Sequence, residues 1–297
     1  MDSAIHYRPA NRADVDQLVS LMNEQYSRKK TAAYFEWQFF QSVLPTVLMI
    51  AEIDNKIIGM FGLQKKFLSN GACVGQLIDL LIAPKNRGQG IFGRLAEKTL
   101  SYCNDIQALA VFPNKNGKRA CEKNLGMVTI AKIDNLKLTN LKINNHIKKE
   151  NCSQNNSQLV KLLKDDKWRN WRYNLHPEYS YKKILLDNGS IMMTKIFSDP
   201  QTKIQYGDIV ETNLMADKFD DFQKLLKLSL TNFLQNDISV ITTWALPHTY
   251  LYDFFKNCGF TGNLQERYFC LKIIDQDYND LSDINNWDLA QIDAEIY

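Results

Sequence analysis

Residues 87–93 read Arg-Gly-Gln-Gly-Ile-Phe-Gly, between a predicted strand over Val74–Ala83 and a helical pattern over Ile91–Cys103. Glycines let the backbone turn so that several N–H groups face one point, and the helix that begins there adds the positive end of its dipole. The dipole contributes only about 0.3–1 kcal/mol, so converging N–H groups must supply most of the hold on a pyrophosphate. The stretch therefore predicts an anion site, with a ligand-free turn as the alternative.

The elements around this stretch predict a mixed α/β unit. A short strand and two helical segments come first, then a hairpin and a third strand lead into the glycines. A strand, a helix closed by Gly126 and a further strand follow. The predicted ranges are Ile5–Tyr7, a helix capped by Asn11, Ala32–Gln41, Val47–Ile53, Ile57–Gln64, Ala108–Phe112, Lys118–Leu125 and Val128–Ile133.

The same order of elements returns in the second half of the chain. Gln76–Leu81 aligns with Gln205–Val210, and Glu122–Met127 aligns with Phe255–Phe260. Two matches in one order at similar spacing predict a duplicated fold. Asn-rich sequence without packing residues separates the copies, which predicts domains at 1–145 and 159–297 joined by a linker at 146–158.

The glycines also satisfy the dinucleotide fingerprint G-x-G-x-x-G over residues 88–93. That fingerprint follows directly after the first strand of a βαβ unit, whereas an antiparallel meander comes first here. The acid expected about 20 residues later should end the next strand. That strand instead ends in Phe112-Pro113-Asn114, so the context disfavours a dinucleotide site.

Residues 5–133 resemble the GNAT acyltransferases, whose signature is Arg/Gln-x-x-Gly-x-Gly/Ala between the fourth strand and the third helix. The resemblance implies a GNAT fold, a mixed twisted sheet flanked by helices, followed by a degenerate GNAT-like half. It implies that acyl-coenzyme A is the donor, with Ile82 and Ala83 pairing with its pantetheine arm. The loop that would hold the pyrophosphate consists of Arg87, Gly88, Gln89, Gly90, Ile91 and Phe92.

The sequence departs from the family pattern in two places. Phe92 replaces a small residue, so its side chain must point away from the phosphates while its N–H stays available. The family often has a Tyr four residues before the helix-ending glycine, where it protonates the departing thiolate. Here that position is Glu122, and an exposed Glu, with a pKa of about 4.3, is ionised at neutral pH. We therefore expect that Glu122 is not the general acid.

Three polar residues are candidates for the chemistry or for acceptor binding. Asp79 lies inside an apolar strand, where an acid is costly unless it is paired or working, and it is our first choice of general base. The alternative is a structural hydrogen bond. Asn114 could orient an amine or cap the following helix. Asp208 repeats Asp79 in the second half, where Glu211–Asp217 contains no glycine and carries two acids, so we expect no coenzyme site there.

An aromatic and basic patch follows the predicted linker and comprises Arg169, Trp171, Arg172, Tyr173 and His176. Its composition suits stacking on a base and pairing with a diphosphate, and a domain-docking clamp is the alternative. Together with the coenzyme loop, the patch resembles acyltransferases of surface-polysaccharide pathways. That resemblance implies a dTDP- or UDP-linked amino sugar as acceptor, bound where the second half completes the cleft. An amino acid, polyamine or protein amine, or a non-catalytic acyl-coenzyme A sensor, are the alternatives.

Composition narrows the class of protein. The 297 residues are 45% hydrophobic and 23% charged, with a net charge of +3, which predicts a globular chain with no polyanion or nucleic-acid partner. The longest apolar run, Val47–Ala51, is far short of the ~20 residues of a membrane span. The six cysteines show no metal-ligand spacing, so we expect reduced thiols, no metal and a cytoplasmic location.

Overall fold

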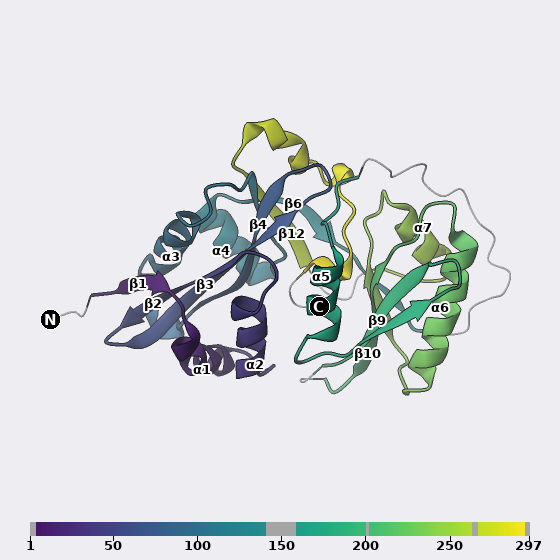
Figure 1. Cartoon of the computed structure of the whole chain (residues 1–297), viewed down its shortest axis with the longest axis horizontal. Coiled ribbons are helices and arrows are strands. Elements are labelled where there is room, and N and C mark those ends of the chain that lie inside the picture. The colour runs from purple at the N-terminus through teal and green to yellow at the C-terminus, as the bar shows by residue number, and fades with distance from the viewer. Residues whose placement is uncertain (1–3, 141–158, 200–201, 263–266, 295–297) are drawn as a thin grey trace. The chain divides into compact units, whose positions relative to one another are not determined.

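The computed structural model describes residues 4–140, 159–199, 202–262 and 267–294, which form two compact units, each with its own sheet (Figure 1). The first unit contains residues up to Thr129 together with Leu163–Glu178 and Cys270–Ser282. The second contains Ile130–Leu162, Tyr179–Phe269 and the residues from Asp283 onward. The predicted linker at 146–158 lies outside the described residues.

The larger sheet has seven strands in the order β1-β2-β3-β4-β5-β12-β6. Its first four strands pair antiparallel, β4 pairs parallel with β5, and β5 pairs antiparallel with β12. The strands are β1 (His6–Pro9), β2 (Thr46–Ile53), β3 (Lys56–Phe67), β4 (Cys73–Ile82), β5 (Ala108–Val111), β6 (Val128–Ile133) and β12 (Arg267–Ile273). The main helices of the unit are α1 (Val15–Gln25), α3 (Ile91–Leu100) and α4 (Lys115–Leu125).

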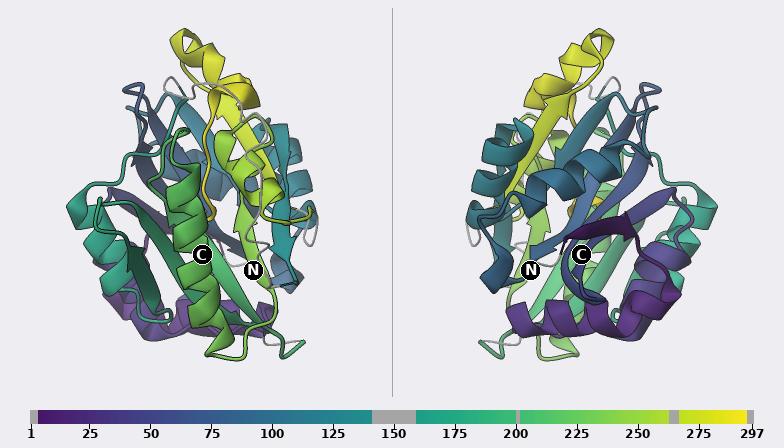
Figure 2. Two further views of the ribbon diagram at one scale, coloured as in Figure 1. Left: turned by 90° about the vertical axis from the view of Figure 1, so that its right-hand side faces the viewer. Right: turned by 90° about the vertical axis from the view of Figure 1, so that its left-hand side faces the viewer.

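The smaller sheet has five strands in the order β7-β11-β10-β9-β8. These are β7 (Asn135–Leu138), β8 (Tyr181–Leu185), β9 (Ile191–Ser198), β10 (Gln205–Thr212) and β11 (Ile241–Trp244), with helices α6 (Phe219–Leu234) and α7 (Tyr250–Asn257). The long helix α6 lies along one face of this sheet (Figure 2, left). Gly207 on β10 permits that approach, because a Cβ there would lie 2.7 Å from the Phe233 ring.

Each sheet contains one strand from the other half of the sequence. β12, near the end of the chain, pairs with β5 from Cys270↔Val111 to Ile273↔Ala108. β7, from the first half, pairs with β11 from Leu138↔Ile241 to Asn135↔Trp244. The compact units therefore differ from the contiguous halves 1–145 and 159–297, because β12 lies between β5 and β6 in the larger sheet and β7 pairs with β11 in the smaller one.

The aromatic patch belongs to the first unit, and its helical segment repeats the arrangement of the segment around Trp37. α2 (Ala32–Phe35) continues as the π-helix η2 (Glu36–Phe40), and α5 (Asp166–Arg169) continues as the π-helix η4 (Asn170–Asn174). The indoles of Trp37 and Trp171 stack at 4.4 Å, and each Nε1 donates to the backbone carbonyl of the other residue at 3.0 and 3.2 Å. The two tryptophans lie 134 positions apart in the chain, close to the spacing of the other repeats, so this reciprocal contact supports the duplication.

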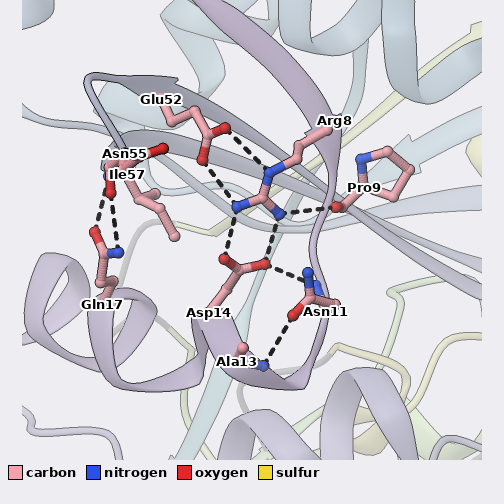
Figure 3. A network of polar contacts seen from close by, with 9 residues as sticks. All are labelled: Arg8, Pro9, Asn11, Ala13, Asp14, Gln17, Glu52, Asn55 and Ile57. Carbon is pink, nitrogen blue, oxygen red and sulfur yellow. Dashed lines mark hydrogen bonds and ion pairs between the residues drawn. The ribbon is translucent and has the colours of Figure 1, made fainter.

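A polar network fixes the start of the first unit (Figure 3). The Arg8 guanidinium on β1 contacts both Asp14 oxygens at 2.7 and 2.8 Å, and it also pairs with Glu52 on β2 at 2.8 Å. Asn11 caps the turn before α1 by accepting from the Ala13 N–H, which confirms the predicted cap. The hydrogen bonds from Arg8 lower the pKa of Asp14, so this carboxylate stays ionised.

Two properties of the described residues bear on the sequence predictions. None of the helices in the part of the chain that the structure describes is long and apolar enough to cross a membrane. Among the same residues, no group of three or more His, Cys, Asp or Glu side chains lies close enough together to hold a metal ion.

Candidate active site

The glycine-rich loop connects β4 to α3 and leaves its backbone uncovered. Gly88 and Gly90 adopt left-handed conformations with φ of +81° and +74°, which residues with a side chain rarely adopt. A Cβ at Gly88, Gly90 or Gly93 would meet no atom within 4 Å, so the loop faces open space. Gly90 is also the N-cap of α3 and offers no side chain to the first N–H groups of the helix. These donors are therefore available to an anion such as a pyrophosphate.

Two side chains of this loop turn toward the protein. Arg87 Nε donates to the Ile82 carbonyl oxygen at 3.0 Å, and Nη2 donates to Gln25 Oε1 at 3.3 Å, so the guanidinium braces the loop against β4 and α1. The Phe92 ring packs against Phe61 at a centroid distance of 5.5 Å, with its plane tilted by 68°. The side chain of Phe92 therefore points away from the loop donors, as expected for a bulky residue at this position.

Strands β4 and β5 separate before the loop is reached. Their parallel pairing extends only from Val74↔Ala108 to Gln76↔Ala110, whereas β4 continues to Ile82. On its other side β4 remains paired with β3, apart from a bulge between Ile78 and Leu81. The part of β4 that ends in Ile82 and Ala83 thus has a backbone edge that β5 does not use. An extended ligand such as a pantetheine arm fits an edge of this kind.

Asp79 lies in the bulge, with a φ of +48°. Tyr34, a buried residue of α2, donates its hydroxyl to Asp79 Oδ2 at 3.0 Å. Burial raises the pKa of Asp79 above its ordinary value, while the Lys30 ammonium and the Tyr34 hydrogen bond act in the opposite direction. The carboxylate is therefore a stronger base than an exposed aspartate.

A second layer of charge lies beside this pair. Lys30 Nζ lies 3.4 Å from the centroid of the Tyr34 ring and 3.1 Å from Glu178 Oε2, and Arg28 Nη2 lies 3.2 Å from the same oxygen. These residues carry no motif in the sequence, because Tyr34 lies within the predicted helix Ala32–Gln41 and the two cations stand in the segment before Thr31.

Comparisons with known proteins agree with this geometry. Residues 14–127 match the acetyltransferase (GNAT) family. An uncharacterized N-acetyltransferase of Archaeoglobus fulgidus is 30% identical over 106 residues, which cover 32% of this chain and 71% of that protein. The chain belongs to the GNAT family. It is an N-acetyltransferase that depends on acyl-coenzyme A, and the matched range includes the loop at residues 87–92.

Solved structures extend the likeness over both units at the level of the fold. A probable N-acyltransferase of Enterococcus faecalis V583 covers 92% of this chain and 73% of its own, with 10% identity and a TM-score of 0.64. A tandem GNAT protein from the clavulanic acid biosynthesis pathway covers 91% and 98%, with 14% identity and a TM-score of 0.53. This chain therefore has a GNAT fold that resembles tandem GNAT structures.

Two further residues lie on or before α4 of this GNAT enzyme. Asn114 caps the helix by accepting from the Gly117 N–H at 2.9 Å, which is the capping alternative of the sequence analysis. Glu122 pairs with Lys118 at 3.0 Å and accepts from the Thr129 hydroxyl at 2.8 Å. Both contacts lower the pKa of Glu122, so it stays ionised and lacks a proton to donate.

The aromatic and basic patch is packed inside the first unit rather than presented to a ligand. Trp171 and Arg172 are 2% and 3% exposed, and the Arg172 guanidinium lies 5.5 Å from the Trp37 ring. Tyr173 packs on Trp168, His176 packs on Trp37 at 4.2 Å, and both are buried, while Arg169 is half-buried. The burial of Trp171, Arg172, Tyr173 and His176 argues against stacking on a base and favours the clamp alternative, whereas Arg169 keeps part of its side chain exposed.

Asp208 repeats Asp79 in the second unit but in a closed setting. It is 3% exposed, accepts from the Thr242 hydroxyl and forms an ion pair with the equally buried Lys195 at 3.8 Å. Burial raises the pKa of Asp208, and Lys195 opposes that change. Asp208 is therefore held by groups of its own unit, which is typical of a structural role.

Proposed function

We propose that this GNAT enzyme transfers an acyl group from acyl-coenzyme A directly to a primary amine in a ternary complex, with Asp79 as general base. The observation that carries the proposal is the position of Asp79 in the β4 bulge, beyond the point where β5 leaves β4 and before the open loop at residues 87–93. A donor held by the loop and along β4 would bring its reacting carbon toward this strand.

The proton balance of the reaction assigns Asp79 its role. Acyl-coenzyme A supplies a thioester, the amine nitrogen forms the new bond to its carbonyl carbon, and the carbon–sulfur bond breaks. The attacking nitrogen must lose a proton, which Asp79 accepts directly or through a water molecule. Because burial raises the pKa of Asp79, kcat/KM should fall as the pH drops through that pKa, in a range above that of an exposed aspartate.

The loop and the strand hold the donor in place. The N–H groups of residues 88–92 bind the pyrophosphate, Arg87 keeps the loop attached to Ile82, and the free edge of β4 pairs with the pantetheine arm. Fixing thioester and amine at attack distance supplies much of the acceleration. Glu122 is ionised and paired with Lys118, which supports a mechanism in which the thiolate leaves without that residue as acid.

For the acceptor we propose an amino sugar linked to a nucleotide. Support comes from the sequence resemblance to acyltransferases of surface-polysaccharide pathways. Trp171 and Arg172 are buried, so the nucleotide handle must be held by residues other than these two. An amino acid, a polyamine or a protein amine remains the alternative acceptor.

The test is a turnover screen with acetyl-coenzyme A and four amines: a UDP-linked amino sugar, free glucosamine, spermidine and lysine. Release of the coenzyme A thiol is followed for the wild type, Asp79→Asn and the control Asp105→Asn, which removes an exposed acid paired with Lys65. We expect the nucleotide-linked sugar to react fastest and Asp79→Asn to lose about 10²–10⁴-fold in kcat. Faster turnover of lysine or spermidine would overturn the acceptor, and a fully active Asp79→Asn would overturn the base.

A further inference from the structure

Glu178 brings a charge from the second half of the sequence to the surroundings of Asp79. Its Oε2 accepts from Lys30 Nζ at 3.1 Å and from Arg28 Nη2 at 3.2 Å. The side chains of Glu178 and Lys30 are only 12% and 15% exposed, so this contact is little screened by solvent. The two cations belong to the segment between α1 and α2.

A continuous set of contacts leads from Glu178 to the proposed base. Lys30, held by Glu178, lies 3.4 Å from the centroid of the Tyr34 ring, within the range of a cation–π contact. The Tyr34 hydroxyl in turn donates to Asp79 at 3.0 Å. Displacing Lys30 would therefore remove both a charge near Asp79 and a contact that fixes the Tyr34 ring.

The position of Glu178 is itself fixed by packing. Its backbone N–H donates to His176 Nδ1 at 3.1 Å, and the His176 ring packs on Trp37 at 4.2 Å. Trp37 is also the residue that stacks on Trp171. The packing of residues 163–178 against Trp37 therefore fixes the position of the Glu178 carboxylate beside Lys30. Through this carboxylate the packing can affect the reaction at Asp79.

Resting on the proposed function, we propose that Glu178 is a positioning residue that holds the Lys30 ammonium against the Tyr34 ring and thereby fixes the Tyr34 hydroxyl on Asp79. The proton acceptor of the first unit then depends on the segment Leu163–Glu178. The second half of the sequence contributes to the reaction through this carboxylate rather than through the aromatic patch.

The charges around Asp79 determine in which direction its pKa should shift when Glu178 is removed. Lys30, Arg28 and the Tyr34 hydrogen bond lower the pKa of Asp79, Glu178 raises it through space, and the Tyr26 hydroxyl lies near enough to sense the Asp79 charge. Burial lowers the pKa of Lys30, whereas Asp79 and Glu178 act in the opposite direction. Loss of Glu178 as a mere charge would lower the pKa of Asp79, but loss of Glu178 as the holder of Lys30 would raise it.

The experiment compares Glu178→Gln, Lys30→Met and the double variant with the wild type. The control is Glu52→Gln, which breaks an ion pair with Arg8, a residue that makes no contact with Lys30, Tyr34 or Asp79 among the contacts described above. The titration of Asp79 is followed by the ¹³C resonance of its carboxyl in protein labelled at aspartate Cγ, assigned by its absence in Asp79→Asn. This readout needs no acceptor, so it stands even when no amine of the screen reacts.

We expect Glu178→Gln and Lys30→Met both to move the Asp79 titration to higher pH, with no further shift in the double variant and none in Glu52→Gln. With a reactive amine, kcat/KM of Glu178→Gln should fall about tenfold to a hundredfold while the Kd for coenzyme A stays unchanged. An unmoved titration, or one that moves to lower pH, would overturn the inference. If Asp79→Asn remains fully active, the proposed base fails instead, whatever the titration shows.

Discussion

The two strand-to-helix junctions of this molecule have the same topology and opposite chemistry. Between β4 and α3, left-handed Gly88 and Gly90 leave helix N–H groups uncovered. Between β10 and α6, the Thr212 hydroxyl donates to Ile191, Asn213 bonds to Gly189 and Ile191, and buried Leu214 accepts from Tyr250 at 2.5 Å. The second junction is thus filled by its own side chains, and Asp220 and Asp221 occupy the first turn of α6.

The strands beside the two acids differ in the same way. Pairing of β4 with β5 ends at Gln76, before Asp79 is reached. Pairing of β10 with β11 continues through Asp208↔Thr242 to Ile209↔Thr243. One duplicated fold therefore supports either a ligand site or a closed core, and the difference rests on glycines in the loop and on where the central strands separate.

Removing the second half of the sequence should have the largest effect, because each half contributes one strand to the sheet of the other. A chain of residues 1–145 lacks β12, whose Cys270 and Leu271 are buried against the first sheet, and leaves the β5 edge open. We expect no cooperative thermal transition by circular dichroism and no coenzyme A binding by calorimetry. Co-expression with residues 146–297 should restore both. If fragment 1–145 folded and bound coenzyme A by itself, the first sheet would not need β12 from the second half of the sequence.

The next effect concerns the open loop. Gly90→Glu places a side chain and a negative charge where the phosphates bind, at a φ of +74° that disfavours any side chain. We expect the Kd for coenzyme A, measured by calorimetry, to rise about a hundredfold, equivalent to about 2.7 kcal/mol. Gly189→Glu is the matched control, because Gly189 also has a positive φ, of +83°, with no atom within 4 Å of a Cβ. Equal losses in both variants would show that backbone strain, not the anion site, causes the effect.

Substitution of Asp208 should reduce stability, whereas substitution of Asp79 should reduce activity. Asp208→Asn leaves Lys195 buried without its ion-pair partner and should lower the free energy of unfolding by about 3 kcal/mol. The turnover of the folded fraction should not change. Asp79→Asn should do the reverse, losing activity while the unfolding free energy in urea stays within about 1 kcal/mol of wild type. Any change in the unfolding free energy should be an increase at neutral pH. Burial raises the pKa of Asp79, so the ionised carboxylate destabilises the folded state above that pKa, and Asn carries no charge.

If Asp208→Asn abolished turnover in fully folded protein, the second unit would hold a working acid and the contrast between the copies would fail. Denaturation curves recorded beside the kinetics decide between these outcomes.

The smallest effect is expected at Glu122. Its pKa is lowered by Lys118 and Thr129, so it carries no proton to give to a thiolate at neutral pH. Glu122→Gln should leave kcat within about tenfold of wild type, whereas loss of a working acid typically costs about 10²–10⁴-fold. A thousandfold drop in kcat without a change in melting temperature would return Glu122 to the mechanism.

The sequence by itself determined the features that depend on local chemistry. A glycine at a left-handed position and the start of a helix are properties of adjacent residues, so the loop at 87–93 was predictable without coordinates. Asp79 was identifiable from the sequence because a carboxylate in an apolar strand is energetically costly unless it is paired or takes part in the chemistry. The duplication was visible from Gln76–Leu81 and Glu122–Met127, although the match of Trp37 with Trp171 was missed because the two segments share aromatic character rather than identical residues.

Only the tertiary structure decided which distant segments meet. The exchange of β7 and β12 follows from the pairing of edges far apart in the chain, which no local pattern encodes. The aromatic patch has a composition that suits a ligand as well as a core, and its burial on Trp37 settled which of the two it forms. Lys30 and Tyr34, Asp79, and Glu178 come from three separate segments, so their charges act on one another only after packing has brought these segments together.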